Sequence, residues 1–427
     1  LTNNGTLNWQ QGNIIYNSST PLVNNNQFNI SGTDQISSGS STFNLTNTGT
    51  ITKTSLGTTL FNSGGSFINS GTLNFNNGKI QIGGFAITNS GNLNFAGGDF
   101  QFRNGSLTYT NGSVLSGTGN FINDGGNLIL TIDLVIPSTI LYSHEPGSTG
   151  NPIVSGAGNL TLNRDFTFLG TLTGAGTLTV NANTTWISGS LGRVFTNQAN
   201  RTLTINGGTQ PLFLGAGGAL TNNGILNWQS GSILVNSDTP LVNNNLLNIS
   251  GNDQIRSNSA TFNLTNTGTI TKSSGGPTTL VSGGSFVNSG TITLNNGILE
   301  SQNMVISNPG NMNFGGGSFE LRGGSLSHNS GSVISGTGNF FNAGGNLSLN
   351  NDLVFPSTLV YTHSSGQTGN PTISGTGNLT INNDFTILGT ITGTGTLTIN
   401  ANTTWISGSM GRIFTNQADR TFTINGG

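Results

Sequence analysis

The chain has 427 residues, a formal net charge of −2 at pH 7 and 6% charged residues, against about 25% in a typical soluble domain. So few charges exclude the basic surface that nucleic acid or an anionic membrane would attract. With no cysteine there are no disulfides and no thiolate metal sites. No run reaches the ~20 apolar residues of a membrane helix, so we expect no membrane insertion of this segment. The 24 phenylalanines, with regularly recurring Leu and Ile, exclude a disordered chain.

A long period runs through the chain. LTNNGTLNW at Leu1–Trp9 returns as LTNNGILNW at Leu220–Trp228. The segment NANTTWISGS returns with the same offset, around Trp186 and then Trp405. We therefore predict two near-identical units, 1–219 and 220–427, the second truncated and continuous with the first. Tandem repetition of this kind is typical of bodies that extend along one axis.

Within each unit a shorter motif recurs roughly every 20 residues, the range of solenoid coils. It reads apolar-x-Asn-x-Gly-x-apolar-x-apolar, as in Leu1–Trp9, Phe67–Phe75 and Ile87–Phe95, with Gly replacing Asn in Val154–Leu162. The intervening residues form short alternating runs that end in polar corners. Gly and Asn at these corners are expected to tolerate a positive φ.

The Asn-x-Gly corner returns once in every three short strands. An antiparallel meander would also place Asn-Gly turns between strands, but it would not require every third turn to match. We therefore predict an all-β fold, a right-handed parallel β-helix with three sides, about 20 residues per coil, about eleven coils per unit and no helices.

Acidic residues are few and dispersed. Glycoside hydrolysis requires two carboxylates close together, and no two acidic residues are adjacent in the sequence. The most acidic local patch, Asp99 with Arg103, changes to Ser318, Glu320 and Arg322 in the second unit. Single aspartates recur between the units and are interpreted as corner residues that bond their own backbone: Asp34 and Asp253, Asp133 and Asp352, Asp165 and Asp384. We predict a non-enzymatic protein with no catalytic, cofactor-binding or metal-binding residue and no cofactor.

The longest break in the strand rhythm lies between Pro137 and Pro152, and we interpret it as a loop leaving the coil. It contains Tyr142 and His144, which match Tyr361 and His363 in the second unit. These four residues are candidates for contacts with another chain or a glycan. A plain surface excursion is the alternative. His328, which has no histidine counterpart, is interpreted as a surface substitution.

A second stretch without the usual corners begins at Trp186, and its counterpart begins at Trp405. Both tryptophans are contact candidates, whereas Trp9 is assigned to the core because it occupies an alternating apolar position. Arg193 and its counterpart Arg412 follow in these stretches. Two interpretations stay open for them: each arginine fixes a loop to backbone carbonyls, or it binds a ligand.

One surface feature recurs after the Asn-x-Gly corner. The residues that flank the inward Leu or Ile are nearly all Thr or Asn: Thr6, Asn8, Thr50, Thr52, Thr72, Asn74, Asn92, Asn94, Thr177 and Thr179. Stacked coils would align them in a flat, uncharged ladder. This ladder reflects either β-propensity with amide ladders between coils or a lattice that binds ice or polysaccharide.

The units SGTGNLTIN (Ser374–Asn382), TGAGTLTVN (Thr173–Asn181) and FINSGTLNF (Phe67–Phe75) resemble those of bacterial surface β-solenoids. They are similar to filamentous-haemagglutinin-like adhesins and to autotransporter passenger domains. The resemblance implies an extracellular or cell-surface fibre or adhesin stalk, with other copies of the chain and surface glycans as partners. It carries no functional residue over. A binding module on the Thr/Asn face is the second hypothesis, and a polysaccharide-cleaving β-helix enzyme is the third.

Overall fold

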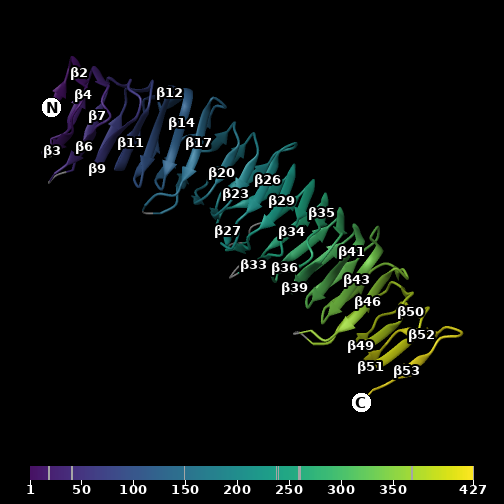
Figure 1. The fold of residues 1–427 in the computed structure, drawn as a ribbon. Coiled ribbons are helices and arrows are strands. Elements are labelled where there is room, and N and C mark those ends of the chain that lie inside the picture. The colour runs from purple at the N-terminus through teal and green to yellow at the C-terminus, as the bar shows by residue number, and fades with distance from the viewer. Residues whose placement is uncertain are drawn as a thin grey trace. The chain divides into compact units, whose positions relative to one another are not determined.

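The computed structural model describes residues 1–17, 20–39, 42–148, 150–236, 238, 240–257, 261–366 and 369–426. The chain divides into two compact units, Leu1–Thr196 and Asn197–Gly427. Each unit is a parallel β-solenoid, and the two together hold about 20 turns of about 21 residues, without a helix among the described residues (Figure 1). The predicted parallel β-helix is confirmed, with about ten turns per unit rather than eleven. The structural division falls before the sequence repeat restarts at Leu220.

Three ladders of stacked strands form the sides of unit 1. Ladder A contains β1 (Thr2–Asn3), β4 (Leu22–Asn24), β7 (Leu45–Asn47), the second halves of β9 (Thr58–Asn69) and β11 (Lys79–Asn89), β13 (Ser106–Tyr109), β15 (Asn127–Leu130), β18 (Ile153–Gly156), β21 (Thr171–Leu172) and β24 (Gly189–Leu191). Ladder B contains β2 (Thr6–Trp9), β5 (Gln27–Ile30), β8 (Thr50–Lys53), β10 (Thr72–Phe75) and the first halves of β12 (Asn92–Arg103) and β14 (Val114–Asp124). A separate ladder joins β16 (Leu134–Ile136), β19 (Leu160–Leu162) and β22 (Leu178–Val180). Ladder C contains β3 (Ile14–Tyr16), β6 (Gln35–Ser38), the first halves of β9 and β11, the second halves of β12 and β14, and β17 (Ile140–Glu145). Strands β20 (Phe166–Phe168) and β23 (Thr184–Trp186) pair with each other, and β25 spans Val194–Asn197.

Unit 2 repeats these ladders in the second copy of the sequence. Its ladder A contains β28 (Ala219–Asn222), β31 (Pro240–Asn243), β34 (Asn263–Asn266), β37 (Ser285–Asn288), β40 (Val305–Asn308), β42 (Ser325–His328), β44 (Asn346–Leu349), β47 (Thr372–Gly375) and the second halves of β49 (Phe385–Ile391) and β51 (Thr403–Met410). Ladder B contains β26 (Thr202–Asn206), β29 (Ile225–Ser230), β32 (Leu246–Ile249), β35 (Thr269–Lys272), β38 (Thr291–Leu294) and the first halves of β41 (Asn311–Arg322) and β43 (Val333–Ala343). A separate ladder joins β45 (Leu353–Phe355), β48 (Leu379–Ile381), β50 (Thr396–Ile399) and β52 (Ile413–Asn416). Ladder C contains β27 (Leu212–Leu214), β30 (Ile233–Val235), β33 (Gln254–Ser257), β36 (Pro277–Val281), β39 (Ile298–Gln302), the second halves of β41 and β43, and β46 (Leu359–Ser364). The first half of β51 pairs with the first half of β49 on one side and with β53 (Phe422–Ile424) on the other.

The core of each unit follows from the alternation within each strand, which sends every second side chain inward. In β10, Leu73 and Phe75 are buried while Thr72 and Asn74 are half-buried. The next turn places Leu93 beside Leu73 and Phe95 beside Phe75. Side chains of one turn therefore cover those of the turn before, which a single coil could not do.

The asparagine of the Asn-x-Gly corner is a core residue. The side chains of Asn24, Asn47, Asn69 and Asn89 are fully buried. The Nδ2 atoms of Asn24, Asn47 and Asn69 each donate to the Oδ1 of the next turn's asparagine at 2.6–2.7 Å, and Asn89 Nδ2 donates to Ser113 Oγ at 3.0 Å. Unit 2 has the same column, which consists of Asn197, Asn222, Asn243, Asn266, Asn288 and Asn308. Each buried amide thus satisfies its neighbour, which removes the cost of burying an unpaired polar group.

The glycine of the same corner is required by space. Neither Asn47 nor Gly71 has a positive φ, so the expected positive φ is not found at the Asn-x-Gly corner, whereas Gly78 and Gly84 at the other corners have φ values of 59° and 76°. A Cβ on Gly71 would lie 2.0 Å from the carbonyl oxygen of Gly49 in the preceding turn. At this corner the backbones of successive turns approach too closely for a side chain at Gly71.

Candidate functional site

The predicted contact loop is shorter than the sequence indicated. Tyr142 and His144 lie in strand β17, and Tyr361 and His363 in β46. All four side chains are buried. Their placement in an exposed loop was therefore wrong, because ILYSHE alternates like any other core strand and only the residues after Glu145 leave the ladder. Gly147 and Gly150 close that shorter loop by an antiparallel bridge.

Each buried tyrosine forms a hydrogen-bonded relay with the histidine two residues later. Tyr142 Oη lies 3.1 Å from His144 Nε2, and His144 Nδ1 lies 2.6 Å from the carbonyl oxygen of Leu169. Since a carbonyl only accepts, Nδ1 carries the proton and Nε2 accepts from the tyrosine. Tyr361 and His363 repeat the relay at 2.9 Å, with Nδ1 2.9 Å from the carbonyl of Leu388. Burial lowers the pKa of His144 and of His363 to about 4, so both imidazoles are neutral near pH 7.

Arg193 and Arg412 are anchored to backbone carbonyls, as one of the two interpretations holds. Arg193 is fully buried and donates from Nε to Thr173 O at 2.8 Å, from Nη1 to Gly158 O at 2.8 Å and from Nη2 to Gly156 O at 3.0 Å. Arg412 makes equivalent bonds to Thr392, Gly377 and Gly375. Because the donors point inward to backbone carbonyl oxygens at the corners, each guanidinium bonds together corners of successive turns.

The tryptophans differ in exposure. Trp186 is buried and stacks on Phe168, with ring centroids 5.7 Å apart, whereas Trp405 is half-buried in β51. Trp9 is buried, as predicted. His328 is 1% exposed, so its interpretation as a surface substitution is wrong. Its Nε2 lies 3.1 Å from the carbonyl oxygen of Asp352.

The recurring aspartates bond the backbone of a neighbouring turn rather than their own. Asp133 Oδ1 accepts from Asn159 N at 2.9 Å, and Asp352 Oδ1 accepts from Asn378 N at 2.8 Å. These hydrogen bonds lower the pKa of both carboxyl groups. The acceptors thereby join one corner to the next.

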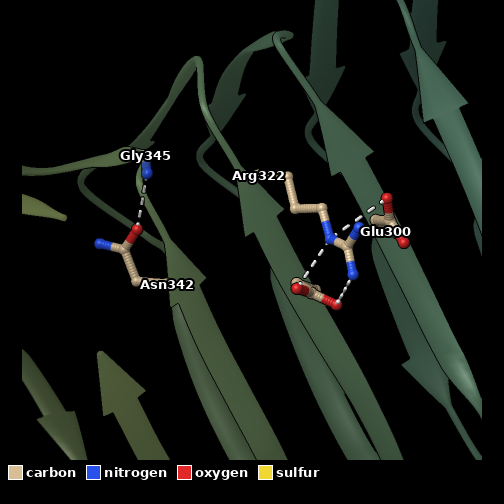
Figure 2. Close-up of polar contacts among 5 residues, drawn as sticks. Glu300, Arg322, Asn342 and Gly345 are labelled. Carbon is tan, nitrogen blue, oxygen red and sulfur yellow. Dashed lines mark hydrogen bonds and ion pairs between the residues drawn. The ribbon is translucent and has the colours of Figure 1, made fainter. Parts of the chain in front are cut away.

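A charged cluster that sequence reasoning missed lies on ladder C of unit 2. Register places Glu300 beside Glu320 on adjacent strands, although a whole turn of the chain separates them. Arg322 donates from Nε to Glu320 Oε1 at 2.8 Å, and its Nε lies 3.3 Å from Glu300 Oε1 (Figure 2). The nearby corner is held by Asn342, whose Oδ1 accepts from Gly345 N at 3.0 Å (Figure 2). The recurring turn length was the signal that could have aligned the two glutamates.

Unit 1 holds the same arginine with different partners. Glu300 and Glu320 correspond to Gln81 and Gln101, and the carboxylate comes instead from Asp124, 3.3 Å from Arg103 Nε. Gln101 Nε2 donates to the same Asp124 oxygen at 2.7 Å. Asp99, expected to accompany Arg103, accepts instead from Asn120. The arginine is thus common to both units. Its carboxylate partner lies in the following turn in unit 1, whereas in unit 2 one partner lies on its own strand and one in the preceding turn.

A shallow polar pocket adjoins each arginine. The unit 2 pocket, of about 250 Å³, is lined by Gln302, Asn303, Glu320, Arg322, Ala343, Ser364, Ser365 and Gly366. The unit 1 pocket, of about 340 Å³, is lined by Leu60, Asn62, Gly64, Gln81, Gly83, Gly84, Arg103, Asn104 and Ser148. The Arg103 side chain is 41% exposed and that of Arg322 49%, and both guanidinium groups already pair with carboxylates. Burial raises the pKa of Glu300, while Arg322 opposes that effect. The two pockets offer hydrogen-bond donors and acceptors. The one carboxylate pair beside them, Glu300 and Glu320, is bound to Arg322.

The outward Thr/Asn rows align on ladder B as predicted. Register places Thr50, Thr72 and Asn92 in one row and Thr52, Asn74 and Asn94 in the next. Many of these side chains bond along the row, as in Asn94 Nδ2 to Asn74 Oδ1 at 3.0 Å. Thr177 and Thr179 are the exception, because Thr179 lies in β22 of the separate β16–β19–β22 ladder and Thr177 directly precedes that strand.

Among the described residues no three acidic or histidine side chains gather in a way that could hold a metal ion. Nor do those residues form any helix with the length and apolarity that a bilayer crossing demands. No protein-family model matches the chain, and neither curated proteins nor solved structures give a match.

Proposed function

We propose that the chain is a structural segment of an extracellular or cell-surface fibre or adhesin stalk, built from tandem β-solenoid repeats and without catalytic activity. The observation that carries the proposal is the buried asparagine column, which recurs in both units with bonds of 2.6–2.7 Å. Other copies of the chain and surface glycans are the proposed partners.

The remaining polar groups support the same role. The inward arginines bond corner carbonyls, the aspartates join successive corners, and the buried histidines are held by tyrosine and carbonyl. The donors and acceptors of these side chains are therefore paired with other groups of the same solenoid. A protein so constructed serves by stiffness and repetition.

Small-angle scattering tests the stalk. About ten turns with a ~4.8 Å rise predict that each unit extends roughly 50 Å along its own axis. Electron microscopy of the native source should show extended rods or fibres of the full protein. A compact monomer in both measurements would overturn the proposal.

A binding module for polysaccharide or ice is the second candidate, and the aligned uncharged rows of ladder B favour it. Thr72→Lys should then abolish retention on the ligand without unfolding the chain. Thr108→Lys is the matched control, since Thr108 is equally half-buried but lies on ladder A. Equal retention of both variants would contradict a ligand on ladder B.

Polysaccharide cleavage, the third hypothesis, has less support. The register pair Glu300 and Glu320 is engaged by Arg322, and its unit 1 counterparts are glutamines. An acid and a nucleophile need separate environments that keep one carboxyl protonated. We therefore do not propose catalysis.

A further inference from the structure

The two corresponding arginines on ladder C differ in their carboxylate partners. Arg322 of unit 2 donates to Glu320 from Nε at 2.8 Å and from Nη2 at 3.4 Å, and Glu300 lies 3.3 Å from the same Nε (Figure 2). Arg103 of unit 1 has Asp124 beside its Nε at 3.3 Å. Within the part of the chain that the structure describes, neither Nη1 nor Nη2 of Arg103 donates a hydrogen bond. The unit 1 guanidinium can therefore take a second carboxylate, as the unit 2 guanidinium already does.

The strand register leaves space beside these two nitrogens. Asn62, Gly83 and Arg103 occupy one outward column in three successive turns of ladder C. Because Gly83 has no side chain, the surface is hollow between Asn62 and Arg103, and all three residues line the pocket of about 340 Å³. Asp124 lies on the opposite side of Arg103, in the following turn. In unit 2 the position of Gly83 is occupied by Gln302.

The other polar side chains of this pocket are neutral. Of the described residues that line it, Arg103 alone is charged, and Gln81, Asn104 and Ser148 supply amides and a hydroxyl. Asn104 Nδ2 donates to Ser148 Oγ at 2.8 Å, which holds the short loop after β17 against the pocket wall. Amides and hydroxyls both donate and accept, as sugar hydroxyl groups require. The volume lies within the range of about 300–1,000 Å³ that small-ligand sites have.

We propose that the unit 1 pocket binds an acidic saccharide, with the ligand carboxylate on Nη1 and Nη2 of Arg103 and sugar hydroxyl groups on Asn62 and Gln81. The planar guanidinium matches a carboxylate in a bidentate pair. The inference rests on the proposed contact with surface glycans and narrows it to sugars that carry a carboxylate, such as uronic acids.

The unit 2 pocket should not bind the same ligand. Arg322 with Glu300 and Glu320 carries a net charge of 1 − 2 = −1, which repels a further carboxylate. Gln302 also fills the place that is hollow above Gly83. The chain should therefore have one site rather than two.

Equilibrium dialysis of the full chain against methyl glucuronide, over a concentration series, tests the ligand class. The wild type should bind one glucuronide per chain, and methyl glucoside, which lacks the carboxylate, at least about tenfold more weakly. Acetate, which has the carboxylate alone, should also bind at least about tenfold more weakly. Equal binding of the glucoside would overturn the role of the carboxylate. Equal binding of acetate would reject the saccharide in favour of an acidic peptide, and two glucuronides per chain would reject the restriction to unit 1.

Two variants test the site. Gly83→Gln introduces the side chain that unit 2 carries there and should weaken glucuronide binding at least about tenfold. The fold should tolerate it, because Gly83 has no positive φ and an added Cβ meets only the Asn62 side chain, at 3.3 Å, within 3.4 Å. Arg103→Lys keeps the charge but removes the planar fork, and it should weaken binding to a similar extent. The control is Arg256→Gln, which removes a positive charge from an exposed position on ladder C of unit 2 and should bind as the wild type does.

Circular dichroism establishes that each variant is folded. A wild type that retains no glucuronide at ~10 mM would overturn the proposal, as would Gly83→Gln or Arg103→Lys binding as tightly as the wild type. Scattering measures the extension of the units separately. Extended units that do not bind glucuronide would thus reject this inference and leave the structural role intact.

Discussion

Individual polar side chains in this protein are buried with their partners, and the tyrosine–histidine relays are the clearest case. His144 is packed against Tyr142, Phe166 and Phe168, and its two ring nitrogens face the tyrosine hydroxyl and the Leu169 carbonyl. Protonation would make both ring nitrogens donors, and Nε2 could then no longer accept the hydrogen bond of the Tyr142 hydroxyl. The relay therefore depends on a neutral ring.

This dependence predicts a loss of stability in acid. Because burial lowers the pKa of His144 and His363 to about 4, the unfolded chain binds protons first as the pH falls below about 6.5. The free energy of unfolding should fall between pH 6.5 and 4 by about 3 kcal/mol per histidine, and below that range the histidines contribute no further loss. Urea titrations at a series of pH values measure it, and His144→Gln with His363→Gln should flatten that interval. An unchanged pH profile in the double variant would contradict the assignment.

Buried arginine makes a second prediction at this scale. Arg193→Met should lower the free energy of unfolding by at least about 2 kcal/mol, because three corner carbonyls lose their donor. Arg201→Met is the control, since Arg201 is exposed. Equal midpoints of the two variants in guanidinium chloride would show that the carbonyl contacts contribute nothing.

Within a turn, the Asn-x-Gly corner combines a side-chain bond with a steric limit. The asparagine joins the column, while the glycine lets the backbone of one corner lie against the next. Where both constraints are present, the corner determines how one turn stacks on the next and not merely where the chain bends.

Substitution of the corner glycine should therefore depend on its turn. Gly71→Ala places a Cβ 2.0 Å from Gly49 O and should destabilise the fold by about 2 kcal/mol or more. Gly5→Ala occupies the same motif position with nothing within 4 Å, so its free energy of unfolding should change by less than about 0.5 kcal/mol. Thermal unfolding of the two variants compares them directly. A similar loss in both would mean that backbone flexibility, rather than the close approach, is responsible.

At the scale of the whole molecule, charge contributes little. Only 6% of residues are charged, and the ion pairs of the described residues gather around Arg103 and Arg322, both of which are partly exposed. Since exposed pairs stabilise weakly and salt screens them, the melting temperature should change by less than about 2 °C between low salt and ~1 M NaCl. Calorimetry at both salt concentrations measures this, and a decrease of many degrees would indicate that ion pairs hold the turns together.

The sequence predicted the solenoid because alternation, corner residues and turn length all repeat. It placed Leu73, Phe75 and Trp9 in the core correctly for that reason. It did not predict the buried role of Asn47, because asparagine in a polar corner also suits an exposed turn. It misplaced His144, because Pro137 and Pro152 break the rhythm around a strand that is otherwise regular. Glu300 and Glu320 lie one turn apart in the chain, so the recurring turn length could have aligned them, but no motif within either strand marks the pair.

The amide column also bears on how such a chain can change its length. Along unit 1 the bonded asparagines are separated by 21, 23, 22 and 20 residues. Insertions and deletions are thus absorbed elsewhere in each turn, since a one-residue slip within the column strand would send its asparagine outward. Each bonded asparagine of the column aligns its turn with the next one, so differences in turn length do not add up along the column. Residues, or whole turns, can therefore be added or lost outside the column strand while the asparagines of the remaining turns stay aligned.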